Sequence, residues 1–465
     1  MTPARRRAIL AAVSLAGFAT NLTLTVLTIA VKPIASHFGG TASDAAWITI
    51  GPMVVTAVLT PAASRAADTY GRKRVWLAGF GLAIAAMAAS GAAWSLSALV
   101  VARLVTGVGI SCVFPAGLAI AVSAYPAHQR GLPVGLWTSV MALSPAAGVI
   151  VGGLLIDHLS WRWLFFAQLP LAIVAFVLAA VVFEEERDPV PGRFDREGAV
   201  LVAGVVLALL LAINRGTAWG WLSWPTLLCA ALAVAGWPLF LAVERRATNP
   251  VIPLPLFRDP VVRWAIISRS ILNGVYMGVF LVLPLYLLEV AEWSAGTVAL
   301  ALVPRPLAMG IAGPLAGRLA RPGNVGPSAI AGALAIVVPT TYFALLEPDW
   351  PYALLAGALV LQGVGLGLMH TASASVVAWR APDAELATAS GVLSITATLA
   401  NSVGMALLLS LVALAGGEDA PSAYRLAFGV GAALAAVGVL GSATFSRTLR
   451  RPAAARARPL ASSGE

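Results

Sequence analysis

Arginines inside apolar segments are the residues of this chain whose type and position could support chemistry. Arg305 stands between Pro304 and Pro306, about midway along an apolar stretch, where it would fall near the centre of a bilayer. A charge at that depth is costly, so it normally faces protein or water. The planar guanidinium suits a carboxylate or a phosphate, which makes Arg305 a candidate anchor for an acidic group. The alternative is a structural arginine that binds carbonyl groups freed beside the prolines.

Two further segments carry polar side chains that could contact a substrate. Arg269, Asn273 and Tyr276 are spaced so that they lie on one face of the apolar segment before Arg305. Gln362 lies in a later apolar segment, in the run LQGVGL. The residues of these segments assigned to substrate binding are Asn273, Tyr276, Arg305 and Gln362.

The first apolar segment has a polar face of its own. Its side chains are spaced 7, 4, 3 and 4 residues apart, as one helical face requires: Ser14, Asn21, Thr25, Thr28 and Lys32. If this face lines a central cavity, Asn21 and Thr25 are substrate contacts. The alternative is a polar seam that hydrogen-bonds a neighbouring helix.

Several kinds of chemistry are excluded by what the sequence lacks. A GxxxxGK[ST] phosphate loop is impossible, because the only lysines, Lys32 and Lys73, follow Val31 and Arg72. The four histidines are scattered, with no HExxH pair for a metal. None of the 20 Asp and Glu residues falls near the middle of an expected helix. We therefore expect no nucleotide-driven pump, no enzyme, no metal and no cofactor.

Composition indicates which elements position these residues. The chain has 59% hydrophobic and 11% charged residues, and its mean hydropathy is +0.89. A soluble domain has about 25% charged residues, so the solvent of this chain is largely lipid. Apolar stretches recur at roughly the 20-residue length that crosses a bilayer. They lack the alternation of a membrane β-barrel. The expected fold is an all-α integral membrane protein.

Fourteen transmembrane helices are predicted from these stretches. Their approximate limits are 8–31, 46–66, 74–94, 97–123, 131–156, 163–183, 198–214, 225–243, 262–288, 296–319, 326–346, 351–378, 386–414 and 422–445. The net charge of +10 comes mostly from loops on one side of this arrangement, which the positive-inside bias makes cytoplasmic. We expect a multi-pass protein of the cytoplasmic (inner) membrane with both termini cytoplasmic, and no nucleic-acid partner.

Internal repeats divide the chain into similar halves. TPAASRAAD (60–68) resembles GPLAGRLAR (313–321), and VTGVGI (105–110) resembles LQGVGL (361–366), at nearly one offset. This pattern predicts two parallel six-helix bundles with two extra central helices. The domain limits expected are 1–183 for the first bundle, 184–261 for the linker and inserted helices, 262–446 for the second bundle, and 447–465 for a cytoplasmic tail.

Three motifs carry a family resemblance. Asp-Thr-Tyr-Gly-Arg-Lys (68–73), Arg-Leu-Val-Thr-Gly-Val-Gly (103–109) and Gly-Val-Ile-Val-Gly-Gly (148–153) resemble signatures of the major facilitator superfamily, specifically its fourteen-helix drug:proton antiporter branch. The resemblance implies gating by Asp68, Gly71, Arg72 and Lys73, and coupling through Arg103. It also implies an antiporter motif on the fifth helix that contains Pro145, Gly148, Gly152 and Gly153. The motif's usual proline is Val149 here, whereas Pro145 lies one turn earlier.

The expected function is export of a small amphipathic organic compound, such as a drug or metabolite, by alternating access with proton antiport. Proton-coupled symport or uniport of an organic anion is the alternative, and a channel fits the repeats less well. Without a mid-membrane acid, proton coupling must use a peripheral carboxylate such as Asp157 or Glu289, a histidine, or the substrate itself. The expected partners are the substrate, the proton and the bilayer, with no nucleotide, and the expected unit is a monomer.

Overall fold

The computed structural model describes residues 2–39, 45, 47–126, 129–185, 194–247, 249–321, 323–347, 350–415 and 420–450. Regular structure in these residues is helical. The long helices are α1 (Pro3–Phe38), α3 (Trp47–Tyr70), α4 (Arg72–Gly91), α5 (Leu96–Ser123), α6 (Gly131–His158), α8 (Leu169–Val182), α9 (Arg196–Trp219), α10 (Trp224–Glu244), α11 (Pro260–Leu285), α13 (Pro304–Leu319), α14 (Val325–Ala344), α15 (Tyr352–Arg380), α16 (Leu386–Leu414) and α17 (Pro421–Arg450). Shorter elements are α7 (Trp163–Phe166), η2 (Leu254–Arg258), η3 (Tyr286–Val290), α12 (Ala295–Ala301) and η4 (Asp383–Glu385).

Helix starts and breaks follow local chemistry. The Ser95 and Asp195 side chains accept hydrogen bonds from the backbone N–H groups of Ala98 and Gly198 and cap α5 and α9. The segment predicted as one helix over 296–319 is divided into α12 and α13, because Pro304 has no N–H to continue the helical ladder.

Twelve helices among the described residues are long and apolar enough to cross a membrane. The all-helical membrane fold expected from the sequence is thus confirmed, whereas the count of fourteen is not reached by this measure. The two remaining predicted spans correspond to α1 and α6, which are helices of 36 and 28 residues. At about 1.5 Å per residue, both exceed the ~30 Å hydrocarbon core.

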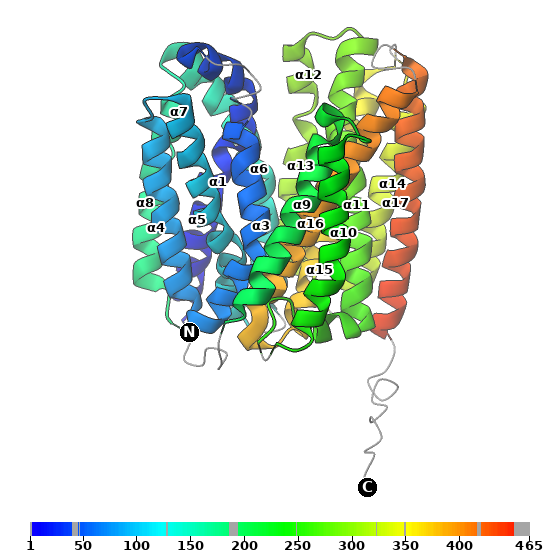
Figure 1. Ribbon diagram of the computed structural model, residues 1–465. Coiled ribbons are helices and arrows are strands. Elements are labelled where there is room, and N and C mark those ends of the chain that lie inside the picture. Colours follow the sequence, from blue (N-terminus) through cyan, green and yellow to red (C-terminus); the bar gives the residue numbers. More distant parts are fainter. Residues whose placement is uncertain are drawn as a thin grey trace.

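The helices pack as two bundles that lie side by side (Figure 1). In the first bundle, α1 packs on α6 and α8, and α5 packs on α3 and α4. In the second, α11 packs on α16 and α17, and α15 packs on α13 and α14. The helices α9 and α10 pair with each other, and α9 also contacts α3 and α16. The domain limits themselves stay predictions.

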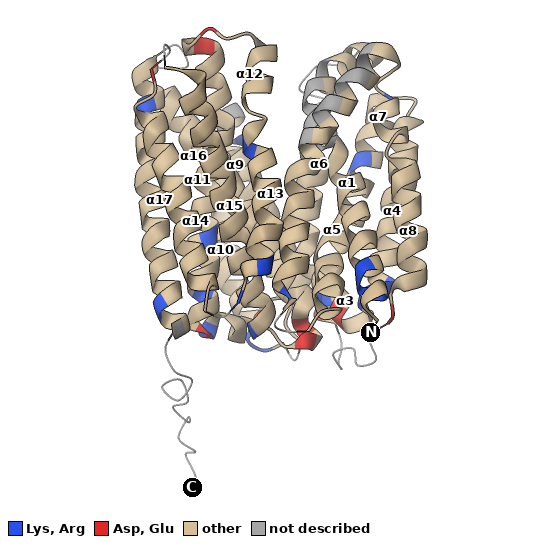
Figure 2. Cartoon of the chain, turned by 180° about the vertical axis from the view of Figure 1, so that it is seen from behind, with Lys and Arg blue, Asp and Glu red and all other residues tan. Residues whose placement is uncertain are grey.

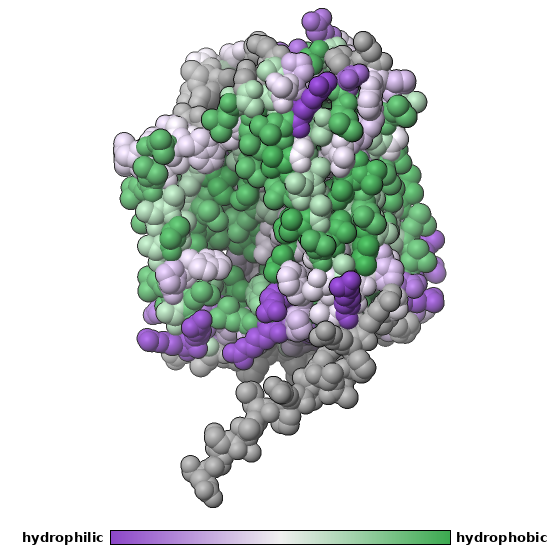
Figure 3. All heavy atoms as spheres, turned by 90° about the vertical axis from the view of Figure 1, so that its right-hand side faces the viewer, coloured by the Kyte–Doolittle hydropathy of each residue, from purple (hydrophilic) through white to green (hydrophobic). Residues whose placement is uncertain are grey.

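Apolar side chains cover the outside of the bundles as well as the interior. Figure 3 shows a broad apolar band with hydrophilic residues toward both ends. Exposed valines on α8, such as Val177 and Val181, belong to this surface. Lysine and arginine gather mainly at the end where α1 begins and α17 finishes, which we call the basic end (Figure 2). The molecule therefore has the surface of a protein solvated by lipid.

Candidate functional site

At the basic end, the Asp68 carboxylate of α3 caps the first turn of α16. Its Oδ2 atom accepts hydrogen bonds from the backbone N–H of Thr388 at 2.7 Å and from the Thr388 hydroxyl at 2.6 Å. Its Oδ1 atom accepts from the Ala387 N–H at 3.2 Å. The first N–H groups of a helix lack internal partners and carry partial positive charge, so a buried carboxylate is stabilised there. One bundle therefore supplies the cap for a helix of the other.

Arg72 completes this contact. Its Nε and Nη2 atoms both lie 2.8 Å from Asp68 Oδ1, and Nη2 also donates to the carbonyl oxygen of Asp383 at 2.5 Å. Asp68 and Arg72 are both buried. The ion pair is formed within the first bundle, but each partner also reaches across to the second. Both residues thus occupy the place where movement of the bundles would break their contacts.

The other two predicted gating residues have different surroundings. Gly71 has φ +104° at the sharp turn between α3 and α4, where a side chain would be strained and would collide with Glu185. Lys73 donates to the carbonyl oxygen of Phe183 at 2.7 Å, within its own bundle. Gly71 therefore shapes the turn, and Lys73 makes no part of the described contact between the bundles.

Two arginines that the sequence analysis did not single out join this contact. Arg130, just before α6, donates to the carbonyl oxygen of Ala378 at 3.0 Å and to Asp383 Oδ1 at 2.7 Å. Buried Arg65 lies 3.6 Å from Glu385 Oε1. In the sequence, the acidic connector before α16, which contains Asp383 and Glu385, was the signal that could have indicated these partners. We call the set Asp68, Arg72, Arg65 and Arg130 with residues 383–388 the charged latch.

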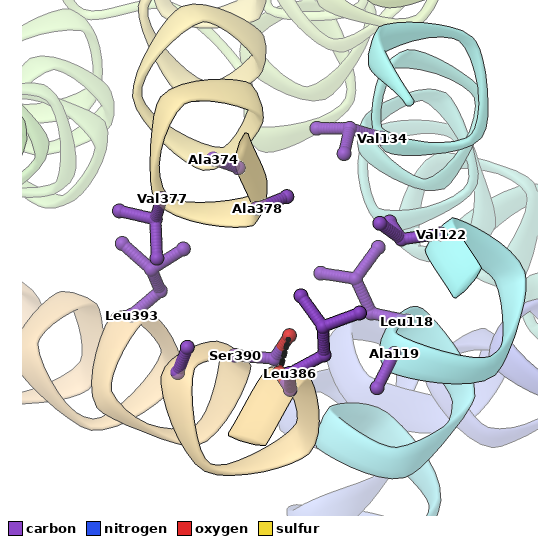
Figure 4. A pocket seen from close by; sticks show the side chains of 11 residues that line it. Leu118, Ala119, Val122, Val134, Ala374, Val377, Ala378, Leu386, Ser390 and Leu393 are labelled. Atoms are coloured by element: carbon purple, nitrogen blue, oxygen red, sulfur yellow. Dashed lines mark hydrogen bonds between the residues drawn. The ribbon is translucent and has the colours of Figure 1, made fainter. Parts of the chain in front are cut away.

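A small apolar pocket lies next to the charged latch, between the bundles. Figure 4 shows its side chains converging from α5, α6, α15 and α16. They are Leu118, Ala119, Val122, Val134, Ala374, Val377, Ala378, Leu386, Ala389, Ser390 and Leu393. The space has room for about one water molecule, so these residues nearly fill it. This apolar plug and the charged latch together close the basic end between the bundles.

On the side of the plug away from the latch, three helices of the second bundle form a polar cluster. His370 Nε2 lies 2.9 Å from Asn273 Oδ1. The Asn273 amide nitrogen donates to Asn401 Oδ1 and, at 3.4 Å, to the carbonyl oxygen of Ala397. Since that nitrogen is a donor, the Asn273 oxygen accepts from the His370 N–H. Sequence analysis named Asn273 here but missed His370 and Asn401.

Arg305 and Tyr276 form a second contact along α11. The Arg305 Nη2 atom donates to the carbonyl oxygen of Tyr276 at 2.6 Å, and the guanidinium carbon lies 3.7 Å from the centre of the Tyr276 ring. Phe280 is the next aromatic neighbour, at 5.1 Å. Arg305 is buried, and its Nε atom has no hydrogen-bond partner among the described residues. The structure thus brings Arg305 and Tyr276 together, as predicted for substrate contacts. The same contact also fits the alternative, a structural arginine.

Comparison of the sequence with known proteins shows which family the chain belongs to. The sequence profile of the Major Facilitator Superfamily matches residues 13–356. The chain belongs to this superfamily. It is 29% identical over 406 residues to the multidrug resistance protein Stp of Mycobacterium tuberculosis (strain CDC 1551 / Oshkosh), covering 87% of this chain and 75% of Stp. It is also 29% identical over 420 residues to the tetracenomycin C resistance and export protein of Streptomyces glaucescens, covering 89% and 77% of the two chains.

A solved structure agrees with this membership. The crystal structure of the human organic anion transporter MFSD10 (TETRAN) superposes with a TM-score of 0.67 at 16% identity, covering 94% of this chain and all of that one. At this identity the likeness concerns the fold. The resemblance drawn from residues 68–73, 103–109 and 148–153 is confirmed, and this superfamily member is a multi-pass membrane transport protein, not an enzyme.

The remaining predicted substrate contacts of this superfamily member are dispersed. Asn21 donates to the carbonyl oxygen of Gly17 at 2.9 Å and lies 3.6 Å from Met141 Sδ, in the first bundle. Gln362 is buried and lies 3.4 Å from the Thr340 hydroxyl, between α15 and α14. The side chain of Thr25 lies outside the described residues. Of the predicted set, the structure thus brings Arg305 of α13 to Tyr276 of α11, one turn from Asn273.

The two predicted coupling residues whose side chains the structure describes, Arg103 and Glu289, make no described contact with each other. Arg103 donates to the carbonyl oxygen of Ile48 at 3.1 Å and lies 5.7 Å from the Phe165 ring, toward the end opposite the basic end. Glu289 is exposed in η3 at that same end. The Asp157 side chain is outside the described residues. Among the residues that the structure describes, no group of three or more His, Cys, Asp or Glu could hold a metal ion.

The antiporter-like segment of α6 makes a close helix contact. A Cβ atom at Gly148 would collide with the carbonyl oxygen of Leu22, so glycine permits α1 to pack there. Pro145 lies inside α6, one turn before Gly148, and Gly152 is buried. The surroundings of Gly153 are not among those that the structure describes. The observed role of this segment is packing of α6 on α1.

Proposed function

We propose that this chain is a secondary active exporter of a small amphipathic organic compound, working by alternating access with proton antiport. Two relatives support the direction of transport: one is named a multidrug resistance protein and the other a resistance and export protein. The proton is the proposed coupling ion, as expected for the antiporter branch, and the proposed unit is a monomer.

The topology follows from charge and helix length. The basic end is the cytoplasmic end, because lysine and arginine are retained on the cytoplasmic side of inner-membrane proteins. Counting α1 and α6 as spans gives fourteen crossings, with both termini cytoplasmic. The limits 1–183, 184–261 and 262–446 then separate two six-helix bundles from the inserted pair α9 and α10.

The observation that carries the proposal is the closure of one end by a buried, charged contact backed by an apolar plug. Asp68 and Arg72 form charge-assisted hydrogen bonds with α16 and its connector that exist only while the bundles meet there. A contact present in one state and absent in another sets the balance between the two states. The charged latch thus favours the conformation that is closed to the cytoplasm.

The faces beyond the plug suit an amphipathic substrate. Along α5 and α6, Phe114 is one turn from Leu118, and Trp137 and Met141 follow Val134 at helical spacing. The Phe114 and Trp137 rings pack edge-on, 5.7 Å apart. The second bundle presents the polar cluster of α11, α15 and α16 instead. A molecule with an aromatic body and a polar group would match both walls.

Proton-coupled symport or uniport of an organic anion is the second candidate. It is favoured by arginines inside spans, Arg305 near the middle of one and Arg269 nearer the cytoplasmic end of another, in a sequence with no Asp or Glu near the middle of a span. An arginine without a nearby carboxylate is best compensated by a negatively charged substrate.

Reconstituted transport tests both candidates. The full chain would be placed in liposomes, and uptake of amphipathic cations, neutral compounds and carboxylates would be followed with and without a pH gradient. The compounds would be chosen by comparing growth inhibition in cells with and without the gene. Exchange of substrate against protons supports antiport. Movement of substrate together with protons, or independently of them, selects the second candidate, and no gradient- or protein-dependent movement of any compound contradicts both.

A further inference from the structure

We propose that Arg269, Asn273 and His370 form a binding site for the acidic group of the substrate, and that protonation of His370 strengthens this binding. The proposal rests on the second candidate function above, proton-coupled transport of an organic anion, because a proton that strengthens binding of the anion would move with it. It names the substrate class: aromatic or other apolar compounds that carry one carboxylate or a similar anion.

Arg269 supplies the observation that points to a ligand. Its Nε and Nη1 atoms are buried and have no hydrogen-bond partner among the described residues. The side chain as a whole is half-buried, so part of it stays accessible. Unpaired guanidinium N–H groups in such surroundings are costly, because they have lost water without gaining an acceptor. A bound carboxylate would give one of them an acceptor while its second oxygen accepts from the neighbouring Nη2.

Asn273, one turn from Arg269 on the same face of α11, holds His370 of α15 in a fixed orientation. Asn273 binds the His370 ring, and Asn401 and the Ala397 carbonyl hold the Asn273 amide. Arg269 gives the site one fixed positive charge. A neutral His370 leaves the site with one positive charge, whereas a protonated His370 gives it two. An anion therefore binds more tightly as the pH falls through the titration of the imidazole.

The helices packed against α15 offer no competing negative charge near His370. From α11 the charged neighbour is Arg269, and from α13 it is Arg305, whose backbone lies at Gly363, two turns from His370. The helices α14 and α16 contain no Asp, Glu, Lys, Arg or His, and Tyr342 is at the far end of α14. The ionisable residues of α6 and α17, and Arg130 before α6, lie near the ends of these helices.

The position of the cluster fits a transported group. His370 precedes Ala374 of the apolar plug by one turn on the same face of α15, and Asn401 follows Leu393 by two turns on α16. The site therefore lies directly behind the plug, on faces that the second bundle turns toward the first. Opening the charged latch and the plug would connect this site to the cytoplasm.

Equilibrium binding tests the site without any need for transport. Radiolabelled 2-naphthoate and its neutral analogue 2-naphthamide would be measured on the purified full chain at about pH 8 and about pH 6. The carboxylate stays ionised at both values, since carboxylic acids titrate near pH 4. We expect 2-naphthoate to bind at least about threefold more tightly at the lower pH, and 2-naphthamide to bind weakly at both.

Variants separate the roles of the two side chains. Arg269→Gln should lower the affinity for 2-naphthoate by about tenfold or more, as loss of a charged hydrogen-bonding partner does. Arg269→Lys keeps the charge and should lose less. His370→Gln should bind 2-naphthoate with one affinity at both pH values. Arg263→Gln, at an exposed arginine of the same helix, is the matched control and should match the wild type.

Several results would overturn the site. They are no 2-naphthoate binding by the wild type up to about 1 mM, equal affinity for the amide, or unchanged pH-dependent binding by folded Arg269→Gln and His370→Gln proteins. Size-exclusion profiles would verify folding, and Arg269→Lys provides a second test if Arg269→Gln misfolds. Failure of transport is distinguishable, because a protein that binds 2-naphthoate through Arg269 but moves nothing in liposomes would retain the site and contradict only the transport function.

Discussion

The two bundles meet along two contacts of opposite character. Where α3 approaches α16, the charged latch joins them through a buried carboxylate, arginines and the start of a helix. Where α6 approaches α13, the contact is made by glycines. A Cβ atom at Gly135 would collide with the carbonyl oxygen of Gly313, and one at Gly313 would lie 2.6 Å from that of Gly135. Gly131 and Gly317 oppose each other in the same way, one turn further.

The two contacts have different roles in the same interface between the bundles. Charge-assisted hydrogen bonds are directional and strong only at the correct geometry, so they can distinguish one conformation from another. The glycine contact depends on backbones coming close, as in other small-residue helix pairs of membranes. Its one described polar addition is the Ser139 hydroxyl, which donates to the carbonyl oxygen of Gly310 at 2.5 Å. Changes in the charged latch should alter the conformational balance, and changes in the glycine contact should alter assembly of the fold.

The largest effect is expected from Gly135→Leu. The new side chain would meet backbone atoms of α13, which cannot move aside as a flexible side chain would. Overpacking of this kind costs about 3 kcal/mol, so the apparent melting temperature and the yield of folded protein should fall sharply. Gly357→Leu is the control, because a Cβ atom there meets nothing within 4 Å. Equal stability of the two variants in thermal size-exclusion measurements would refute the packing role.

The next largest effect is expected from Asp68→Asn, on transport instead of stability. Loss of the charge weakens the ion pair with Arg72 and the cap on α16, so transport by reconstituted protein should fall about tenfold or more. Asp259→Asn is a matched control. Asp259 also caps a helix, α11, and pairs with Arg380, but both partners belong to the second bundle. If both variants transport equally well, the charged latch has no special role.

A smaller effect is expected from Arg130→Gln. Its ion-pair partner Asp383 has a side chain that is 75% exposed, and exposed pairs contribute about 0–1 kcal/mol. Loss of this pair and of the bond to the Ala378 carbonyl should reduce the transport rate about two- to threefold. An effect as large as that of Asp68→Asn would mean that the burial of a residue does not determine how much it contributes to the charged latch.

The smallest effect is expected from Glu289→Gln. Glu289 is exposed in η3, far from both contacts and from the polar cluster around His370. A change there should leave the rate and its dependence on the pH gradient within about twofold of the wild type, as for other exposed surface positions. Loss of proton dependence in this variant alone would instead make Glu289 the coupling residue.

Local patterns explain which part of this structure the sequence could predict. Apolar runs of spanning length and the motif at 68–73 are contiguous, so the sequence could predict the helices and the superfamily and could single out Asp68 as a candidate. The limits of the prediction appear where a helix breaks, as between α12 and α13, and where partners are distant. Thr388 lies 320 positions from Asp68 along the chain, and no local spacing pairs the two residues.

The polar cluster shows the same limit. His370 was noted only as one of four scattered histidines, although it is the one placed well inside a spanning helix. Its relation to Asn273 and Arg269 depends on how α15 packs on α11, which periodicity does not give. Conversely, Gln362 was chosen from a repeat, but its side chain lies between α15 and α14 because that face of the helix is buried within the second bundle.

The central claim is that the charged latch holds the cytoplasmic side closed. Spin labels would report the distance between the bundles in a protein with Cys112 and Cys229 replaced by serine. They would be placed at two exposed positions: Arg74, beside the latch on the first bundle, and Ala384, in the connector that the second bundle contributes to the latch. We predict one dominant short distance in the wild type, and a growing population at longer distance in Asp68→Asn but not in Asp259→Asn. Identical distance distributions in the wild type and Asp68→Asn would contradict the claim.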